Sequence, residues 1–206
     1  MPNQKRMLYA TTNPSKLARM QKILKSLPIE LLSIIDSGST AQIQEDGSTP
    51  ESNAIIKARY HFVRLGLPTL AVDSGLTINR FPAHMQPGIF VRRIFGADQD
   101  VSDDQMLAYY AHALESVGGQ SRGTWTTSIA LMVSSSKIYS ATITSETKFI
   151  AKMSPIVMPG EPLNSLQIDS VSGKYFSEMT AEQRAGAQQK RASGILDFVQ
   201  EHWHDI

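Results

Sequence analysis

The order of apolar patterns along the chain constrains its fold more than any other feature of the sequence. Up to Ile78, short apolar runs alternate with segments whose apolar residues recur at helical spacing. Two long segments rich in Thr, Ile, Val and aromatic residues come later, Thr124–Val133 and Lys137–Ile150, with three serines between them. Alternating strands and helices favour parallel pairing, whereas two long strands joined by a short polar turn favour an antiparallel hairpin. The sequence therefore predicts an α/β fold built on a mixed sheet.

The same periodicities predict the boundaries of the elements. Asn13 is a typical N-cap and Pro14 a typical first helical residue, so a helix is expected to begin there. A second helix is expected after the polar loop that ends in Thr49-Pro50-Glu51. The expected strands are Met7–Thr11, Ile29–Ile35 and Leu70–Val72, with Leu76–Ile78 as a candidate continuation, and the expected helices run from Pro14 to near Pro28, from Pro50 through Leu65, over Asp103–Glu115 and over Thr180–Trp203.

Composition excludes several classes of protein. The chain has 206 residues, a net charge of +1 and no cysteine, so disulfides, cysteine-based metal sites and a catalytic thiol are excluded. Its near-neutral charge gives no strong attraction to nucleic acid or to an anionic membrane. No apolar run approaches the roughly 18 residues of a membrane span, and the N-terminus does not resemble a signal peptide. We therefore expect a cytoplasmic protein that forms one domain over residues 1–206 and binds neither nucleic acid nor membrane.

The junction between the first strand and the first helix is rich in groups that bind anions. A strand that leads through a polar loop into a helix N-terminus directs the free N–H groups of the first turn, and the positive end of the helix dipole, toward the loop. Thr11, Thr12 and Ser15 add hydroxyl donors, and Lys16 adds a positive charge. This pattern favours a phosphate chain as the ligand. The alternative is a well-capped helix with a solvated lysine, and the stretch alone does not distinguish the two.

Two acidic residues lie near this junction in the expected fold. Glu45 lies in the loop before the second helix, and Asp73 follows the short buried strand, where Ser74 and Gly75 continue the chain as an expected turn. The carboxyl edge of a sheet is where α/β folds place their sites. Two carboxylates beside a phosphate chain suit Mg²⁺, which prefers oxygen ligands and bridges phosphate oxygens. Taken singly, each residue is also explained as part of an ordinary loop or turn.

Taken together and in this order, these residues resemble the inosine triphosphate pyrophosphatase family. The family opens with a strand and Thr-x-Asn-x-x-Lys, which matches Thr11, Asn13 and Lys16. The later motifs span roughly the first half of the chain, and together they are specific although no single one is. They are a Glu shortly before a loop glycine, here Glu45 and Gly47; Asn-Ala-x-x-Lys-Ala, here Asn53–Ala58; Asp-Ser-Gly-Leu, here Asp73–Leu76; and Pro-Gly-Ile-aromatic with a later Arg, here Pro87–Phe90 and Arg93.

The resemblance implies a long mixed β-sheet flanked by helices, with two lobes around a central cleft, and a homodimer. It also implies Mg²⁺-dependent hydrolysis of a nucleoside triphosphate, non-standard purine triphosphates among them, to the monophosphate and pyrophosphate. Lys16 would neutralise phosphate charge, while Glu45 and Asp73 would serve Mg²⁺ and the attacking water, so these three residues form the expected catalytic set. The expected phosphate-binding set is Thr11, Thr12, Asn13, Ser15, Lys16, Ser74, Gly75 and Arg93.

The second half of the chain departs from the family pattern where the family binds the base. Gly160–Ser165 replaces a Gly-Phe-Gly-Tyr-Asp-Pro turn, and Gln188-Gln189-Lys190 replaces Ser-His-Arg. Val72 replaces the first residue of an Asp-Asp pair. A site that reads a base edge can discriminate by about 10⁴, so the family's base preference is not transferred to this chain. The expected base-binding set is Asn164, Lys174, Arg184, Gln189, Lys190 and Arg191, the last of them if the register slips by one residue.

Two hypotheses from different classes remain open. The first is a Mg²⁺-dependent nucleoside triphosphate pyrophosphatase with an altered base preference. The second is a catalytically weak or inactive paralogue that binds nucleotides and has a regulatory or structural role, which Val72 and the lost base turn favour. A related group of pyrophosphatases, whose N-terminal loop reads Ser-Pro-Arg-Arg, fits Asn13-Pro14-Ser15-Lys16 less well. Release of pyrophosphate from a panel of triphosphates distinguishes the first two hypotheses.

Overall fold

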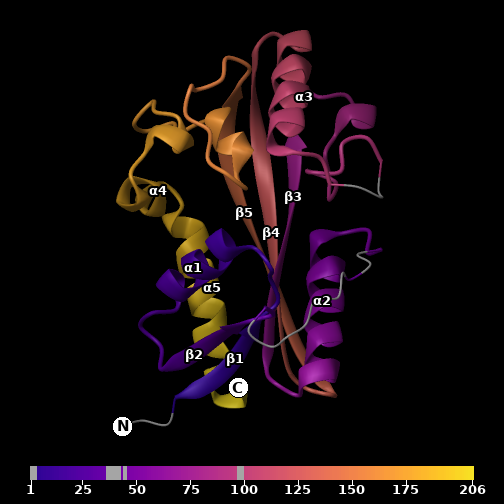
Figure 1. Cartoon of the computed structure of the whole chain (residues 1–206), viewed down its shortest axis with the longest axis vertical. Helices are drawn as coiled ribbons and strands as arrows, with labels where there is room; N and C mark the ends of the chain where they lie inside the picture. The colour runs from indigo at the N-terminus through magenta and orange to yellow at the C-terminus, as the bar shows by residue number, and fades with distance from the viewer. Residues whose placement is uncertain (1–3, 36–42, 44–45, 97–99) are drawn as a thin grey trace. The chain divides into compact units, whose positions relative to one another are not determined.

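The computed structural model describes residues 4–35, 43, 46–96 and 100–206. Within these residues, none of the helices is long and apolar enough to cross a membrane. Figure 1 shows the elements in chain order. They are β1 (Lys5–Tyr9), α1 (Pro14–Ile23), β2 (Ile29–Ser33), α2 (Pro50–Leu65), β3 (Thr69–Ile78), α3 (Asp103–Ser116), β4 (Gln120–Ser134), β5 (Lys137–Ile150), β6 (Gln167–Ile168), α4 (Ala181–Ala187) and α5 (Gln189–Glu201).

The strands form one mixed sheet in the order β2-β1-β3-β4-β5-β6. Strand β1 pairs in parallel with both β2 and β3, and its residue Met7 lies opposite Leu31. Strands β5 and β6 are antiparallel. The predicted hairpin is present, because β4 and β5 are neighbours joined by a two-residue turn at Ser135 and Ser136. The predicted α/β class with a mixed sheet is therefore confirmed.

The chain divides into two compact units that share these strands. The first unit comprises Met1–Ser74, Thr127–Ile143 and Lys190–Ile206, and the second comprises Gly75–Thr126 and Thr144–Gln189. Strands β3, β4 and β5 each pass from one unit into the other. Each described residue of the candidate site can therefore be assigned to one of the two units.

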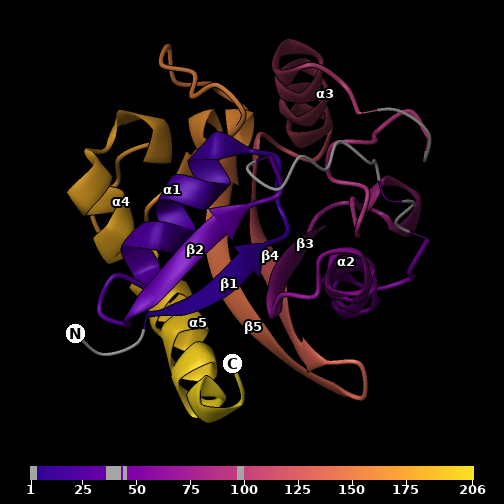
Figure 2. The same ribbon diagram turned by 60° about the horizontal axis from the view of Figure 1, so that its bottom comes forward.

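In the first unit, helices cover both faces of the sheet (Figure 2). Helix α2 packs through Ala54 and Ala58 on the face that contains Ala71. On the other face, α1 and α5 pack on a cluster that includes Leu70 and partly buried Val72. Successive side chains of a strand point to opposite faces, so this alternation along β3 directs the residue after Val72, an aspartate, toward α2.

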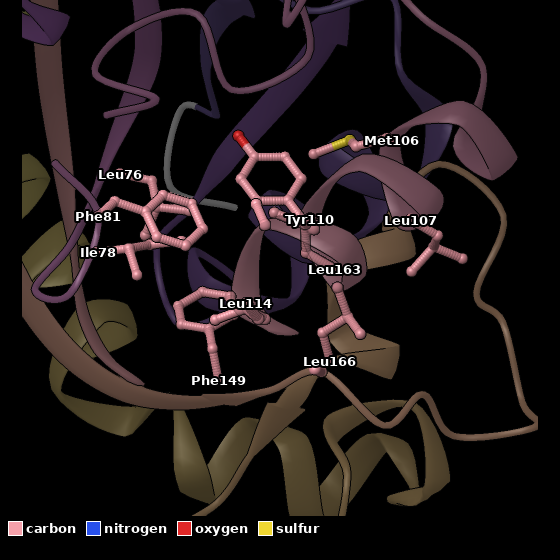
Figure 3. Close-up of a cluster of buried hydrophobic side chains, with 12 residues drawn as sticks. Leu76, Ile78, Phe81, Met106, Leu107, Tyr110, Leu114, Phe149, Leu163 and Leu166 are labelled. Atoms are coloured by element: carbon pink, nitrogen blue, oxygen red, sulfur yellow. The ribbon is translucent and has the colours of Figure 1, made fainter. Parts of the chain in front are cut away.

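The second unit has its own core, shown in Figure 3. Helix α3 contributes Tyr110 and Leu114, which pack with Ile78 and Phe149 from β3 and β5. The hydroxyl group of Tyr110 donates a hydrogen bond to the carbonyl oxygen of Val91 at 3.0 Å, so the one polar atom of this buried ring has a partner. Four apolar residues that recur at helical spacing along α3 are all buried, namely Met106, Leu107, Tyr110 and Leu114.

The predicted starts of α1 and α2 are confirmed. Asn13 caps α1 with Pro14 as the next residue. Thr49 caps α2 in a reciprocal capping box with Ser52, and Pro50 follows. Each capping side chain accepts hydrogen bonds from N–H groups that lack a partner inside the helix, which stabilises the helix start by about 1 kcal/mol.

Among the elements that precede α2, three predicted ends are wrong. Helix α1 ends at Ile23 instead of near Pro28, because the Pro28 carbonyl oxygen accepts a bond from the Lys5 N–H and the chain must already be extended there. Strand β1 ends at Tyr9 because the Thr11 N–H turns back to the Tyr9 carbonyl oxygen. Strand β2 ends at Ser33, before the predicted Ile35.

The predicted final helix over Thr180–Trp203 is two helices. Helix α4 ends at Ala187 and α5 begins at Gln189. At the break, the Gln188 N–H bonds to the carbonyl oxygens of both Arg184 and Gly186, which is a tightened last turn. Gly186 is a poor helix former close to that turn. The buried apolar residues of this region, Ile195, Phe198 and Val199, all belong to α5.

Acid is expected to destabilise the first unit through His61 of α2. This imidazole is 1% exposed, and its Nδ1 has no hydrogen-bond partner among the described residues. Burial lowers the pKa of His61, and the charge of Arg64 lowers it further. A lowered folded-state pKa means that the stabilisation is complete above the unfolded value of about 6.5 and is lost as the pH falls below it.

The measurement is the thermal midpoint at pH 7.5 and at pH 5.0, for the wild type and for His61→Leu. The wild type is expected to lose several degrees more than the variant on acidification, since about 1 kcal/mol corresponds to ~2–4 °C for a domain of this size. An equal acid shift in both proteins would exclude His61 as the cause.

Candidate active site

Asp73 lies in the middle of strand β3, and the predicted strand end at this position is wrong. Asp73-Ser74-Gly75 has the composition of a turn, but β3 runs unbroken from Thr69 to Ile78. This strand lies between β1 and β4 in the sheet. Its register with β1 ends at Leu70, so pairing with β4 outweighs the local turn preference at Asp73. The carboxylate therefore projects from a rigid strand.

Two side chains of α2 hold the two oxygens of Asp73. The Lys57 ammonium lies 2.7 Å from Oδ1, and the Asn53 amide donates to Oδ2 at 3.4 Å. The side chains of Lys57 and Asp73 are each 14% exposed. Asn53 and Lys57 are four residues apart, so they share one face of the helix. Lys57 was not among the predicted site residues, although the spacing of Asn53 and Lys57 in the family motif was a signal that could have identified it.

The first turn of α1 differs from the sequence expectation. The Asn13 side chain accepts hydrogen bonds from the N–H groups of Ser15 at 2.9 Å and Lys16 at 3.2 Å. The Asn13 N–H in turn donates to the Thr11 hydroxyl group at 3.2 Å. The expectation of free N–H groups in this turn is therefore wrong at Ser15 and Lys16, because a good N-cap satisfies them. Thr12 makes no hydrogen bond within the described part of the chain, and it is exposed.

The side chain of Lys16 is exposed to solvent, and charges of the first unit act on its ammonium group. Desolvation lowers the pKa of Lys16, the positive charges of Lys57, Arg19 and Arg191 lower it further, and the charge of Asp73 partly offsets them. These four cations and one carboxylate come from α1, α2, α5 and β3. Their excess of positive charge favours an anion, and a phosphate chain would relieve the mutual repulsion of the cations.

The remaining predicted phosphate ligands divide between the two units. The Ser74 hydroxyl group lies 3.3 Å from that of Thr127, in the first unit. Gly75 and Arg93 belong to the second unit. The Arg93 guanidinium lies 5.1 Å from the centre of the Phe90 ring, and both residues line a small cavity of about 260 Å³ within that unit.

Asn164, predicted to contact the base, is buried in the second unit with its amide already bonded. It lies in a short 3₁₀-helix, Pro162–Ser165. Its Nδ2 donates to the Glu161 carboxylate at 3.0 Å and its Oδ1 accepts from Gln167 at 3.5 Å. An amide with one donor and one acceptor engaged in a buried position has little capacity left for a base edge.

The other predicted base ligands lie in different surroundings. Lys174 is exposed in the second unit. Arg184 donates to the backbone carbonyl oxygens of Phe176 and Met179, so part of its guanidinium supports the chain. Gln189 and Lys190 are exposed at the start of α5. The positive charge of Arg191 lowers the pKa of the Lys16 ammonium group, as described above. The role of Arg191 in binding the base stays a prediction.

An ion pair anchors the segment that replaces the family's base turn. The Arg92 guanidinium lies 2.7 Å from Asp103 Oδ1 and also donates to the Gly160 carbonyl oxygen, while the Gly160 N–H donates to Asp103 Oδ2 at 2.7 Å. Desolvation raises the pKa of Asp103, but the bonds from Gly160 and Arg92 outweigh it and the net pKa is lowered. Arg92 therefore has a structural partner in α3.

The metal assignment rests on Asp73. Glu45, the second predicted ligand, lies outside the described residues. Among the residues that the structure does describe, no three His, Asp or Glu side chains form a metal cluster. Mg²⁺ is often bound by one or two carboxylates together with substrate phosphates rather than by an all-protein cage. A carboxylate has about four lone-pair directions and Asp73 uses two of them, so it can still ligate a metal ion.

Comparisons with known proteins identify the family of this chain. The family model of the Ham1 family matches residues 7–154. A dITP/XTP pyrophosphatase of Geobacter sulfurreducens is 33% identical over 193 residues, which cover 93% of this chain and 94% of that protein. A dITP/XTP pyrophosphatase of Coxiella burnetii is 39% identical over 115 residues, 56% of this chain and 55% of that one.

Two solved structures share the fold. A HAM1 protein from Coxiella burnetii aligns with a TM-score of 0.79 and 26% identity, over 96% of this chain and 99% of that chain. The Staphylococcus aureus Ham1 protein aligns with a TM-score of 0.75 over 96% of this chain and 99% of that chain, and at 19% identity it supports the fold alone.

Proposed function

This chain belongs to the Ham1 family, and from that premise we propose that it hydrolyses a nucleoside triphosphate to the monophosphate and pyrophosphate. The predicted resemblance to inosine triphosphate pyrophosphatases is confirmed by the family match and by relatives named as dITP/XTP pyrophosphatases. The observation that carries the proposal is the cluster of charged side chains around Lys16 and Asp73 in the first unit. Asp73 is held at both oxygens by α2, and the cations around Lys16 accompany it.

The proposed reaction matches what this cluster can do. Phosphoryl transfer needs positioning and charge neutralisation more than covalent catalysis. In the reaction, a water oxygen bonds to the α-phosphorus and loses a proton to the solvent. The anhydride bond between the α- and β-phosphates breaks, and pyrophosphate leaves with the electron pair. Lys16 and Arg191 would hold the phosphate oxygens, with Thr12 and Ser15 as hydroxyl donors. Lys57 would compensate part of the negative charge of the Asp73 carboxylate.

We propose Mg²⁺ as the metal ion, with Asp73 and Glu45 as its protein ligands. Enzymes of this family generally need a divalent metal ion. Bound Mg²⁺ would neutralise part of the negative charge on the phosphate oxygens. The predicted catalytic set of Asp73, Glu45 and Lys16 is thereby kept as a proposal, and Lys57 is added to it.

The base preference is proposed to differ from that of the family. Asn164 is buried with its amide engaged, and Arg184 is partly committed to backbone carbonyl oxygens. Relaxed or shifted discrimination among non-standard and common purines is the expected result. The predicted homodimer remains a proposal, which Phe90 and Phe95 support because they are 40% and 74% exposed.

The alternative remains a nucleotide-binding paralogue with weak or no activity. Val72 favours it, because this side chain packs against the apolar cluster of the first unit and cannot act as an acid. The binding residues named above would serve such a protein equally well. The two candidates therefore differ only in turnover.

The test is a panel of common and deaminated nucleoside triphosphates, assayed for pyrophosphate release with Mg²⁺ and with a chelator. Release from at least one triphosphate, abolished by the chelator, is the expected result. Its kcat/KM is expected to vary among purines by much less than the roughly 10⁴ that a base-reading site achieves. Binding of a triphosphate without release from any member would instead favour the paralogue.

A further inference from the structure

Asn53 of α2 has no exposed surface, and its side-chain amide bonds in two directions. Its Oδ1 accepts a hydrogen bond from the Gly47 N–H at 2.9 Å, and its Nδ2 donates to Asp73 Oδ2 at 3.4 Å. An N–H group can only donate, so the amide oxygen must face Gly47 and the NH₂ group must face the carboxylate. The orientation of this amide is therefore determined by its partners.

The backbone at Gly47 is close to α2 because the residue is glycine. A Cβ atom there would lie 2.3 Å from the Ser52 hydroxyl oxygen and 2.5 Å from the Asn53 Oδ1. The capping box of Thr49 and Ser52 braces the same turn. The loop that leads into α2 is thus attached to the helix at the point where Asn53 bonds to it.

The two partners of Asp73 differ in stiffness. Lys57 is a flexible side chain whose ammonium group is a point charge. Asn53 has two side-chain torsions, is fully buried and has a planar donor group, so it restricts the direction of the carboxylate. Charge compensation and orientation are therefore supplied by different residues.

We propose that Asn53 is a positioning residue, which fixes the Asp73 carboxylate and couples it to the loop backbone at Gly47. This role rests on the function proposed above. Gly47 follows Glu45 by two positions in the sequence, so the coupling links the strand that carries one proposed acid to the loop whose sequence carries the other. No direct contact of Asn53 with the substrate is required.

Two substitutions separate the two bonds of the amide. Asn53→Leu, similar in size, removes both bonds, whereas Asn53→Asp keeps an acceptor for Gly47 and loses the donor to Asp73. His61→Leu is the matched control. This residue lies on the same helix and is also buried, but its Nδ1 makes no hydrogen bond to any described residue. The readouts are kcat and KM for the best triphosphate, and the hydrogen exchange rate of the Gly47 amide measured by NMR.

Both Asn53 variants are expected to lose about 10²-fold in kcat with KM changed less than threefold. Exchange at Gly47 is expected to rise at least tenfold in Asn53→Leu. It is expected to stay within threefold of wild type in Asn53→Asp, because the introduced carboxylate is a stronger acceptor for the Gly47 N–H than the amide and offsets the lost bond to Asp73. The control is expected to keep kcat and Gly47 exchange within threefold. A kcat within threefold of wild type in both folded Asn53 variants, or a loss equal to that of the control, would overturn the proposal.

A further arm distinguishes failure of this inference from failure of the proposed function. If Asn53 couples Asp73 to the loop, Asp73→Ala raises the hydrogen exchange rate of the Gly47 amide at least threefold. In a double variant that also carries Asn53→Leu, Asp73→Ala causes no further increase in this rate. This readout does not need turnover. If the wild type releases no pyrophosphate but the exchange pattern holds, the function fails and the coupling stands. If Gly47 exchange in Asp73→Ala equals that of the wild type, the coupling fails whatever the activity.

Discussion

Replacing Asp73 with asparagine is expected to lower the rate of pyrophosphate release by at least about 10³-fold. The substitution removes the negative charge that would ligate Mg²⁺, and losing one transition-state contact alone typically costs roughly 10²–10³ in rate. In the wild type, the Lys57 ammonium lies 2.7 Å from Oδ1 of Asp73. The side-chain oxygen of asparagine can accept a hydrogen bond from the same ammonium group, so the fold is expected to be retained. The measurement is steady-state pyrophosphate release with Mg²⁺, together with circular dichroism.

Asp205→Asn is the matched control for this prediction. Asp205 also lies 2.7 Å from a lysine, Lys137, in the same unit, but this pair is more exposed and has no proposed role in the reaction. Its variant is expected to keep the wild-type rate within twofold. A folded Asp73→Asn protein that retained more than a tenth of the activity would contradict the assignment of the catalytic carboxylate.

Replacing Lys16 with alanine is expected to weaken triphosphate binding tenfold or more. A charge-assisted hydrogen bond is worth about 1.5–3 kcal/mol, and each 1.4 kcal/mol is a factor of ten. The measurement is calorimetric titration with pyrophosphate and with a triphosphate in the absence of turnover. Lys22→Ala, on the exposed surface of the same helix, is expected to bind as the wild type does. Unchanged affinity in Lys16→Ala would exclude the proposed contact.

The lowered pKa of Lys16 predicts that triphosphate binding depends on pH. Desolvation and the charge of Lys57 lower the Lys16 pKa in the free protein, with Arg19 and Arg191 contributing in the same direction and Asp73 opposing them. A phosphate prefers the protonated ammonium, so above this pKa binding requires proton uptake and affinity falls as pH rises. Because the pKa is lowered, the fall begins below the ordinary lysine range. Lys16→Arg keeps its charge and is expected to lose that dependence, whereas identical pH profiles would contradict the argument.

Local signals in the sequence predicted the fold where local and long-range preferences agree. Asn13 and Thr49 start helices as expected, because their capping bonds involve only neighbouring residues. The hairpin at Ser135 and Ser136 follows from alternating β-branched residues on either side. At Asp73 the turn composition failed as a signal, since pairing of β3 with strands far away in the sequence determines the backbone there.

The candidate site was predictable in its chemistry but not in its contacts. Lys16 and Asp73 were identified from their motifs, and the structure places both in the first unit. The bond from Asp73 to Lys57 joins residues sixteen apart in the sequence on different elements, so no local pattern specifies it. The Asn13 cap, which was predicted correctly, also satisfies the N–H groups expected to bind phosphate. Glu45 lies outside the described residues and stays a prediction.

The base side was less predictable because the chain departs there from the family motif. Burial of Asn164 and the bonds of Arg184 to backbone carbonyl oxygens depend on the packing of the second unit. Sequence matching transfers a residue type to a position, but it does not determine whether the polar atoms at that position are already bonded to the protein.

The central claim, hydrolysis between the α- and β-phosphates, is tested most directly by identifying the products. Phosphorus-31 NMR would follow inosine triphosphate and the best member of the panel, with Mg²⁺ and either the wild type or Asp73→Asn. The account predicts monophosphate and pyrophosphate in equal amounts with the wild type, and unchanged triphosphate with the variant. A diphosphate with orthophosphate would contradict the proposed reaction. Unchanged triphosphate with the wild type, despite calorimetric binding, would contradict enzymatic function and leave the nucleotide-binding paralogue.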